Sequence, residues 1–256
     1  ITTAAVTPQP MAVDAHAVTG DSSNHNGVLE PGEMVEVAPV WLNTLATLQT
    51  LSGTASNLTG PPGPTYTLSD TFADYGDVAA GATADCATAV GGCYLMGVSG
   101  TRPGQHWDAA FTETLLPVEA PLLALALKTW KLHVGESFAD VPTSSPVYPF
   151  VENLFHSGVT GGCAGGGYCP SNAVTRAQMA VFLMKSKLGS SRVPPPATGT
   201  AFLDVPASNP FAPWIEQMAG FQITGGCGGG NYCPNSPVTR AQMAVFLLRS
   251  VHGACY

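Results

Sequence analysis

The pattern of apolar and polar positions divides the chain into two parts. Up to about residue 135, short segments rich in β-branched and aromatic residues are separated by clusters of Gly, Pro, Asn and Asp, and no helical period is present. Examples are MVEVAPVWL, TYTLSDTF and LKTWKLHV. We therefore expect an all-β antiparallel sandwich over residues 11–135, with PMAVDAHAV as its first strand.

The ten residues before this sandwich form a separate prediction. The segment ITTAAVTPQ is rich in apolar residues and threonine and has no obvious partner nearby in the sequence. An unpaired strand of this kind can add to the sheet of another molecule. We therefore interpret residues 1–10 as an N-terminal extension that acts as a donor strand.

The second part of the chain is a tandem repeat. Residues 137–189 match residues 201–253 without a gap and with 29 identities in 53 positions, and VTRAQMAVFL occurs in both copies. In the first copy Phe150, Val151, Leu154 and Phe155 fall on one helical face. Each copy is predicted to contain two helices, joined by the loops GGCAGGGYCP and GGCGGGNYCP.

The second helix of each copy has a clear predicted start. Thr175 followed by Gln178, and Thr239 followed by Gln242, have the spacing of a capping box. Three prolines in VPPPATGT interrupt any helix between the copies. The predicted organisation is therefore a multidomain chain, with repeats at residues 136–190 and 201–256 and a linker at residues 191–200.

The cysteines indicate an oxidising compartment. Six of the seven fall into three close pairs, and Cys255 is left over. The glycine loops lack the helix start of a phosphate site and the spacing of a redox pair, and a zinc site would need cysteines from both repeats. Disulfides within the loops explain the spacing best: Cys86 with Cys93, Cys163 with Cys169, and Cys227 with Cys233.

Charge and composition limit the possible partners and location. Nine Lys and Arg against 17 Asp and Glu give a formal charge of -8, which disfavours nucleic acid as a partner. No apolar run approaches the roughly 18 residues that a membrane span requires. The chain begins with Ile1, as expected after removal of a secretion signal, although a chain trimmed for another reason would look the same. We expect a secreted protein that is extracellular or located at the cell surface.

A polar loop in the β-rich part is a candidate calcium site. DSSNHNGVLEPGE places oxygen donors at short spacing around a glycine, and hard oxygen ligands suit Ca²⁺. No helices flank the loop, so the prediction is a calcium loop on a β-domain rather than an EF-hand. A polar turn without a metal is the alternative. The candidate ligands are Asp21, Asn24, Asn26, Glu30 and Glu33.

The sequence contains no recognised catalytic motif. The six histidines have no regular ligand spacing, and no G-x-S-x-G is present. His106 stands two residues before Asp108, which is more typical of a hydrogen-bonded pair at the edge of a sandwich than of a catalytic pair. We therefore expect a protein without enzymatic activity.

The repeats resemble the S-layer homology family of bacterial surface proteins. The resemblance rests on FADVP and FLDVP, the glycine loops and the two VTRAQMAVFL segments, in that order. It implies a helical fold that binds cell-wall polysaccharide, often through the arginine of a Thr-Arg-Ala-Glu motif, here Arg176 and Arg240. Gln178 and Gln242 replace the glutamate, and two repeats stand where the family commonly has three. A solvated or carboxylate-paired arginine is the alternative.

The preceding domain resembles the calcium-binding β-sandwich modules of secreted bacterial proteins, on the basis of the NGVLEPGE turn and the spacing of its strands. Two functions follow from these features. The first is a structural subunit that assembles with copies of itself into a surface filament or layer, through its sandwich, its N-terminal strand and its repeats. The alternative is an anchor module that holds a secreted protein on cell-wall polysaccharide.

Overall fold

Alternating buried and exposed residues produce the β-sheets of the first part of the chain. In strand β8, Asp108–Leu116, every second residue from Ala109 to Leu115 is buried, as expected when one face of a strand meets a core. The computed structural model describes residues 6–87, 92–116 and 127–252. Within them the chain forms two compact units, Ile1–Asn153 and Leu154–Tyr256.

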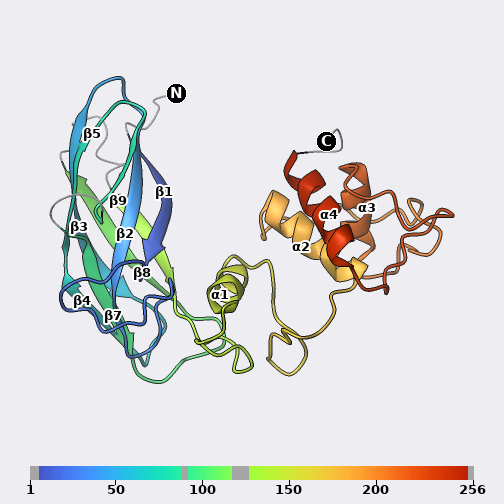
Figure 1. Cartoon of the computed structure of the whole chain (residues 1–256), viewed down its shortest axis with the longest axis horizontal. Helices are drawn as coiled ribbons and strands as arrows, with labels where there is room; N and C mark the ends of the chain where they lie inside the picture. Colours follow the sequence, from blue (N-terminus) through green and yellow to red (C-terminus); the bar gives the residue numbers. More distant parts are fainter. Residues whose placement is uncertain (1–5, 88–91, 117–126, 253–256) are drawn as a thin grey trace. The chain divides into compact units, whose positions relative to one another are not determined.

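The first unit contains two antiparallel sheets that face each other (Figure 1). One sheet has the order β1-β2-β7-β4, with β6 paired to β2, and the other has the order β5-β3-β8-β9. The strands are β1 Val6–Val13, β2 Met34–Asn43, β3 Gln49–Thr59, β4 Thr65–Asp70, β5 Phe72–Val78, β6 Thr83–Asp85, β7 Tyr94–Ser99, β8, and β9 Leu127–His133. The predicted β-sandwich is confirmed.

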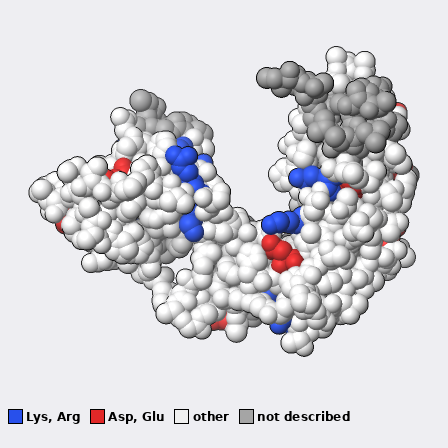
Figure 2. All heavy atoms as spheres, turned by 180° about the vertical axis from the view of Figure 1, so that it is seen from behind, with Lys and Arg blue, Asp and Glu red and all other residues white. Residues whose placement is uncertain are grey.

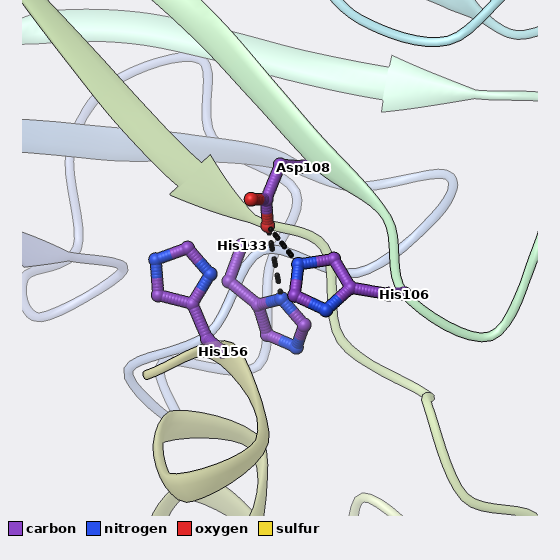
Figure 3. Close-up of side chains that lie close together, drawn as sticks. All are labelled: His106, Asp108, His133 and His156. Atoms are coloured by element: carbon purple, nitrogen blue, oxygen red, sulfur yellow. Dashed lines mark hydrogen bonds and ion pairs between the residues drawn. The ribbon is translucent and has the colours of Figure 1, made fainter. Parts of the chain in front are cut away.

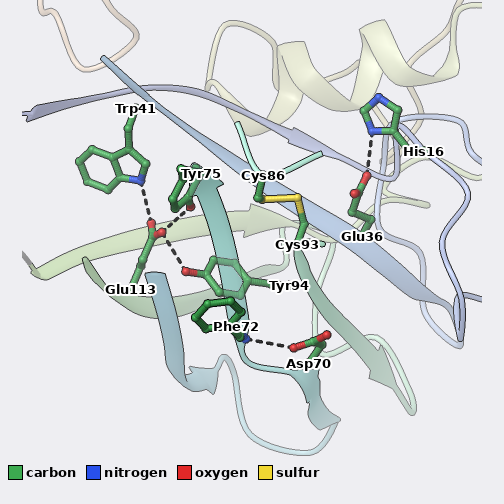
Figure 4. The surroundings of a disulfide bond; sticks show 10 residues. All are labelled: His16, Glu36, Trp41, Asp70, Phe72, Tyr75, Cys86, Cys93, Tyr94 and Glu113. Carbon is green, nitrogen blue, oxygen red and sulfur yellow. Dashed lines mark hydrogen bonds and ion pairs between the residues drawn. A yellow bond between two sulfur atoms is a disulfide. The ribbon is translucent and has the colours of Figure 1, made fainter. Parts of the chain in front are cut away.

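The sandwich core contains a buried carboxylate that accepts four hydrogen bonds. Glu113 on β8 accepts hydrogen bonds from Trp41 at 3.2 Å, Tyr75 at 2.5 Å, Tyr94 at 2.8 Å and Trp130 at 2.6 Å. Figure 4 shows the first three of these contacts. Burial raises the pKa of Glu113, although the four hydrogen bonds act in the opposite direction. The donors come from both sheets, so this network fixes how the two sheets face each other.

The first strand differs from its prediction. Val6 to Gln9 pair with Val40 to Asn43 of β2 in the same chain. The predicted donor strand thus pairs within its own chain at residues 6–9, because these residues complete the edge of the five-stranded sheet. Residues 1–5 of the predicted donor strand lie outside the described residues.

The first unit also includes most of helix α1, Tyr148–His156. Tyr148 is buried, and its hydroxyl accepts a hydrogen bond from the Glu136 N–H at 2.8 Å. The boundary between the units thus falls inside α1, whereas the sequence places the start of the first repeat at residue 136. Val151 is buried as predicted, but Phe150 remains 68% exposed, so the predicted apolar face is only partly buried.

The second unit is built from the helices α2 Arg176–Leu188, α3 Ala212–Gly220 and α4 Arg240–His252 (Figure 1). Thr175 is the N-cap of α2, and the capping box with Gln178 is complete. Thr239 and Gln242 exchange the corresponding two hydrogen bonds at 3.2 Å. Both predicted helix starts are confirmed. Met184, Ile215, Met218 and other buried side chains of α2 and α3 form the core of the unit.

All three predicted disulfides are present. Cys86 bonds to Cys93 inside the sandwich core, next to the Glu113 network (Figure 4). Cys163 bonds to Cys169 and Cys227 bonds to Cys233, so each glycine loop is closed by its own disulfide. Cys255 lies outside the described residues. None of the helices in the described part of the chain has the length and apolar character that crossing a bilayer requires.

Candidate functional site

Residues of both repeats line an open pocket of about 320 Å³ in the second unit. One wall comes from Arg176 at the start of α2, and a second from the turn between α3 and the second cysteine loop. The third wall is one face of α4. The lining side chains are Arg176, Ile223, Thr224, Gln242, Val245, Phe246 and Arg249. The pocket is therefore a product of the duplication, because a single repeat supplies only part of its wall.

Backbone hydrogen bonds hold the start of α2 against the second repeat. The first N–H groups of a helix have no partner within the helix and must find one outside it. Here the Arg176 N–H donates to the Ser236 carbonyl at 2.9 Å, and the Ala177 N–H donates to the Pro234 carbonyl at 3.0 Å. The start of α2, and Arg176 with it, is thereby fixed relative to the second cysteine loop.

The Arg176 side chain is buried and only partly satisfied. Its Nε donates to the Tyr232 carbonyl at 2.8 Å, and its guanidinium carbon lies 4.8 Å from the Tyr232 ring centre and 5.4 Å from that of Phe246. The residue is 3% exposed, and its Nη2 is buried with no hydrogen-bond partner in the described structure. A buried N–H donor of a cation that has no acceptor lowers the stability of the fold.

The repeat signature builds the turn beside the arginine. Asp204, from FLDVP, accepts hydrogen bonds from the N–H groups of Tyr232 and Cys233, both at 2.7 Å. The Thr224 hydroxyl oxygen accepts from the Gly226 N–H at 3.1 Å. Gly226 has φ +88°, and a Cβ there would lie 2.3 Å from the Asn231 carbonyl oxygen, so glycine is required. The aspartate, cysteines and glycine of the repeat thus shape one wall of the pocket.

The structure separates the two arginines that the sequence treats alike. Arg240 stands at the same place in the second repeat, but its side chain is exposed and it does not line this pocket. Arg249 does line it, near the end of α4. Sequence reasoning missed Arg249, because only the packing of α4 beside Arg176 brings it there. The basic character of the last turns of α4 was its one available signal.

The polar loop of the first unit brings four of the five predicted calcium ligands together. Asn24 Nδ2 donates to Glu30 and to Glu33, each at 3.1 Å, and Asn26 Nδ2 donates to Glu30 at 2.8 Å. Asp21 instead accepts a hydrogen bond from the Val18 N–H at 2.8 Å. The loop residues therefore gather two carboxylates and two amides, while the first predicted ligand stabilises the preceding turn.

A further carboxylate, absent from the sequence prediction, joins this loop. Asp14 follows β1, is fully buried, and accepts a hydrogen bond from the Asn26 N–H at 2.9 Å. Its Oδ1 has no hydrogen-bond partner in the described structure, although His25 Nδ1 lies 3.5 Å away. Burial, together with hydrogen bonding to Glu30 and the charges of Glu30 and Asp14, raises the pKa of Glu33 to about 8. Such crowding of carboxylates is typical of a cation site.

The chain thus combines a β-sandwich with tandem helical repeats that line a pocket with two arginines. Residues 137–180 and 201–244 each match the family model of the S-layer homology domain. These matches support the assignment of both repeats to that family. S-layer homology domains are cell-surface anchoring modules that bind cell-wall polymers.

Other comparisons are less informative. None of the curated proteins compared with the chain matches it. Among solved structures, a FixG-related protein from Vibrio parahaemolyticus is 9% identical, with a TM-score of 0.23, covering 51% of this chain and 94% of its own. A PapD-like domain of human CEP192 is 13% identical, with a TM-score of 0.22, covering 42% of this chain and 73% of its own. Scores this low carry no information on function.

Proposed function

We propose that the helical unit anchors the protein at a bacterial cell surface by binding an anionic cell-wall polymer in the pocket between the repeats. The observation that carries this proposal is the open pocket between the repeats, which is lined by Arg176 and by the half-buried Arg249. The Arg249 guanidinium would donate to an anionic or hydroxyl oxygen of a polysaccharide bound there. The family match of both repeats supports the same function.

The charge distribution favours an anionic polymer. Residues 154–256 contain six Lys and Arg and two Asp and Glu, whereas residues 1–153 contain three Lys and Arg and fifteen Asp and Glu. In the face drawn in Figure 2, Lys and Arg side chains form a short row on the helical unit. The helical unit is therefore basic although the whole chain has a formal charge of -8, and a basic unit attracts an anionic ligand.

Co-sedimentation with purified bacterial cell walls tests the proposal. The full chain should sediment with intact walls and should stay in solution after the polymers attached to peptidoglycan have been extracted. Arg249→Ala should reduce binding at least about tenfold, the effect expected for losing one charge-assisted contact of about 1.5 kcal/mol. Arg192→Ala is the matched control, because Arg192 is an exposed arginine outside the pocket. Equal binding by Arg249→Ala and the wild type would overturn the proposed pocket.

Self-assembly is a second proposal, supported by the apolar surface of α4. Val245, Leu247, Leu248 and Val251 are 41% to 71% exposed, an unusual concentration of apolar side chains on one helix of a folded unit. A second copy of the helical unit could cover this surface. Sedimentation velocity should then show a concentration-dependent oligomer that Leu248→Glu disrupts. A wild-type chain that stays monomeric at high concentration would exclude this mode of assembly.

We further propose that the polar loop binds Ca²⁺ through Asp14, Asn24, Asn26, Glu30 and Glu33. The specific support is Oδ1 of Asp14, a fully buried carboxylate oxygen beside the loop that accepts no hydrogen bond and has only His25 Nδ1 nearby, at 3.5 Å. A divalent cation would satisfy this oxygen and would offset the repulsion among the three carboxylates. The ion would then connect the end of β1 to the loop that precedes β2.

A further inference from the structure

Three side chains with metal-binding atoms meet at one end of the four-stranded sheet. Asp108 is the first residue of β8 and lies directly opposite His133, the last residue of β9. His106 precedes Asp108 by two residues, a spacing that returns a side chain to the same face of an extended chain. Figure 3 shows the three side chains pointing toward one another. The figure also labels His156, the last residue of α1, which belongs to the second unit; the site is defined by the three residues of the first unit.

The distances fit one ion. Asp108 Oδ1 lies 3.1 Å from His106 Nε2 and 3.5 Å from His133 Nδ1, and all the candidate ligand atoms lie within 4.8 Å of one another. Ligands about 2.0–2.1 Å from a tetrahedral Zn²⁺ are separated from each other by about 3.3–3.4 Å. The two contacts to Asp108 bracket that value and the other separations are at most 4.8 Å, so the side chains would have to close in further to hold one ion.

The second nitrogen of His133 is held as in known metal sites. Its Nε2 lies 2.7 Å from Glu152 Oε2, and the other oxygen of that buried carboxylate accepts from the Ser137 N–H at 2.9 Å. A metal-bound histidine usually donates its other N–H to a carboxylate or carbonyl, which fixes the tautomer and the ring orientation. A proton held on Nε2 by Glu152 would direct the Nδ1 lone pair, now 3.5 Å from Asp108 Oδ1, toward a shared metal.

We propose that His106, Asp108 and His133 form a binding site for a divalent transition metal, and that this metal is Zn²⁺. Two imidazoles and one carboxylate form a donor set that suits zinc and is poorly matched to Ca²⁺ or Mg²⁺, which prefer oxygen ligands alone. Three protein ligands leave the fourth tetrahedral position to water. The ion would join the His106 loop to the ends of β8 and β9.

Protonation of His133 is the alternative to metal binding at this cluster. Without a metal, His133 lies between two carboxylates, those of Asp108 and Glu152, and in the imidazolium form it donates to both. Added Zn²⁺ distinguishes a metal site from a protonated His133. A metal site binds Zn²⁺ saturably and needs His106 for that binding, whereas a protonated His133 without a metal site gives no saturable Zn²⁺ binding. The proposal does not depend on the anchoring function, since all its residues lie in the first unit.

Titration of the full chain with Zn²⁺ and Co²⁺ separates these states. The disulfides are kept intact, free thiols are alkylated, and excess Ca²⁺ is present to occupy the polar loop. We expect one equivalent of Zn²⁺ to bind and raise the Tm, and Co²⁺ to give the visible absorption of a tetrahedral nitrogen and oxygen site. Inductively coupled plasma analysis of the dialysed complex gives the stoichiometry.

Two variants and one control test the assignment. His106→Ala should weaken Zn²⁺ binding at least about tenfold and abolish the cobalt spectrum, and its side chain is 46% exposed, so the fold should be retained. Asp108→Asn should behave similarly. His16→Ala is the control, since His16 is a half-exposed histidine that lies 2.8 Å from Glu36, outside the cluster. The proposal is overturned if the wild type shows no saturable Zn²⁺ binding, or if His106→Ala and the wild type bind equally.

Discussion

Arg176 and Arg240 occupy the same position of two identical decapeptides, yet replacing each by alanine should have very different effects. Removing the Arg176 side chain deletes its Nε hydrogen bond to the Tyr232 carbonyl, a bond to a charged group worth about 1.5–3 kcal/mol. It also deletes the stacking on Tyr232 and Phe246, worth about 2 kcal/mol when desolvated. The substitution also removes the buried, unpaired Nη2, whose cost of about 1–3 kcal/mol offsets part of this loss, so Arg176→Ala should lower the free energy of unfolding of the helical unit by about 2 kcal/mol.

Arg240→Ala removes an exposed side chain, and surface substitutions usually change stability by less than about 0.5 kcal/mol. Hydrogen exchange of peptides from α2 to α4 in increasing denaturant measures the helical unit separately from the sandwich. Peptides of the sandwich provide the internal control, because neither variant changes that unit. Equal losses for the two variants, or a loss below about 1 kcal/mol for Arg176→Ala, would refute the placement of Arg176 in a buried pocket wall.

Three further predictions concern the other features of the structure. EDTA should lower the Tm of the sandwich, and Ca²⁺ at 100 times its Kd should restore the Tm by raising the free energy of unfolding by about 2.7 kcal/mol. Asp14→Asn should abolish this effect of Ca²⁺, whereas Asp74→Asn, a change outside the loop, should retain it. Replacing Cys227 and Cys233 by Ser should destabilise the helical unit by about 2 kcal/mol, and an unchanged unfolding midpoint would contradict the disulfide's stabilising role. Burial raises the pKa of Glu113 in the fold, so the folded state binds this proton more tightly than the unfolded state does, and wild-type stability should fall as pH rises from about 4.5 through the folded pKa. Glu113→Gln cannot titrate and should show a flatter profile in chemical unfolding; parallel profiles would show that Glu113 does not contribute to the pH dependence.

The sequence predicted the features that depend on local pattern. The sandwich, the two repeats, the capping boxes at Thr175 and Thr239, and the three disulfides all have short-range signatures, and the structure contains each of them. The partner of the first strand was not predictable in this way. Residues 6–10 pair with β2 across about thirty residues of intervening chain, and nothing in their own composition identifies that partner.

The site could be predicted only in part, for the same reason. Asn24, Asn26, Glu30 and Glu33 are close in sequence and were found together, but Asp14 joins them through the end of β1. The sequence also gave Arg176 and Arg240 equal roles, because their flanking residues are identical. What distinguishes them is the neighbouring repeat, which covers Arg176 and supplies Arg249. Likewise, the pairing of His133 with Asp108 follows from strand register, which the local pattern does not define.

The carboxylate at position 113 also has a consequence for how this domain can change over time. Its four donors come from four different strands, so losing the carboxylate alone leaves four buried polar groups without an acceptor. Losing one donor is a smaller defect, and replacing all five residues by apolar ones is tolerable in principle. Related domains should therefore carry either the complete set of one acid, two tryptophans and two tyrosines or an apolar substitute for all of it, with few intermediates. That all-or-nothing distribution is a diagnostic by which distant members of this sandwich could be recognised.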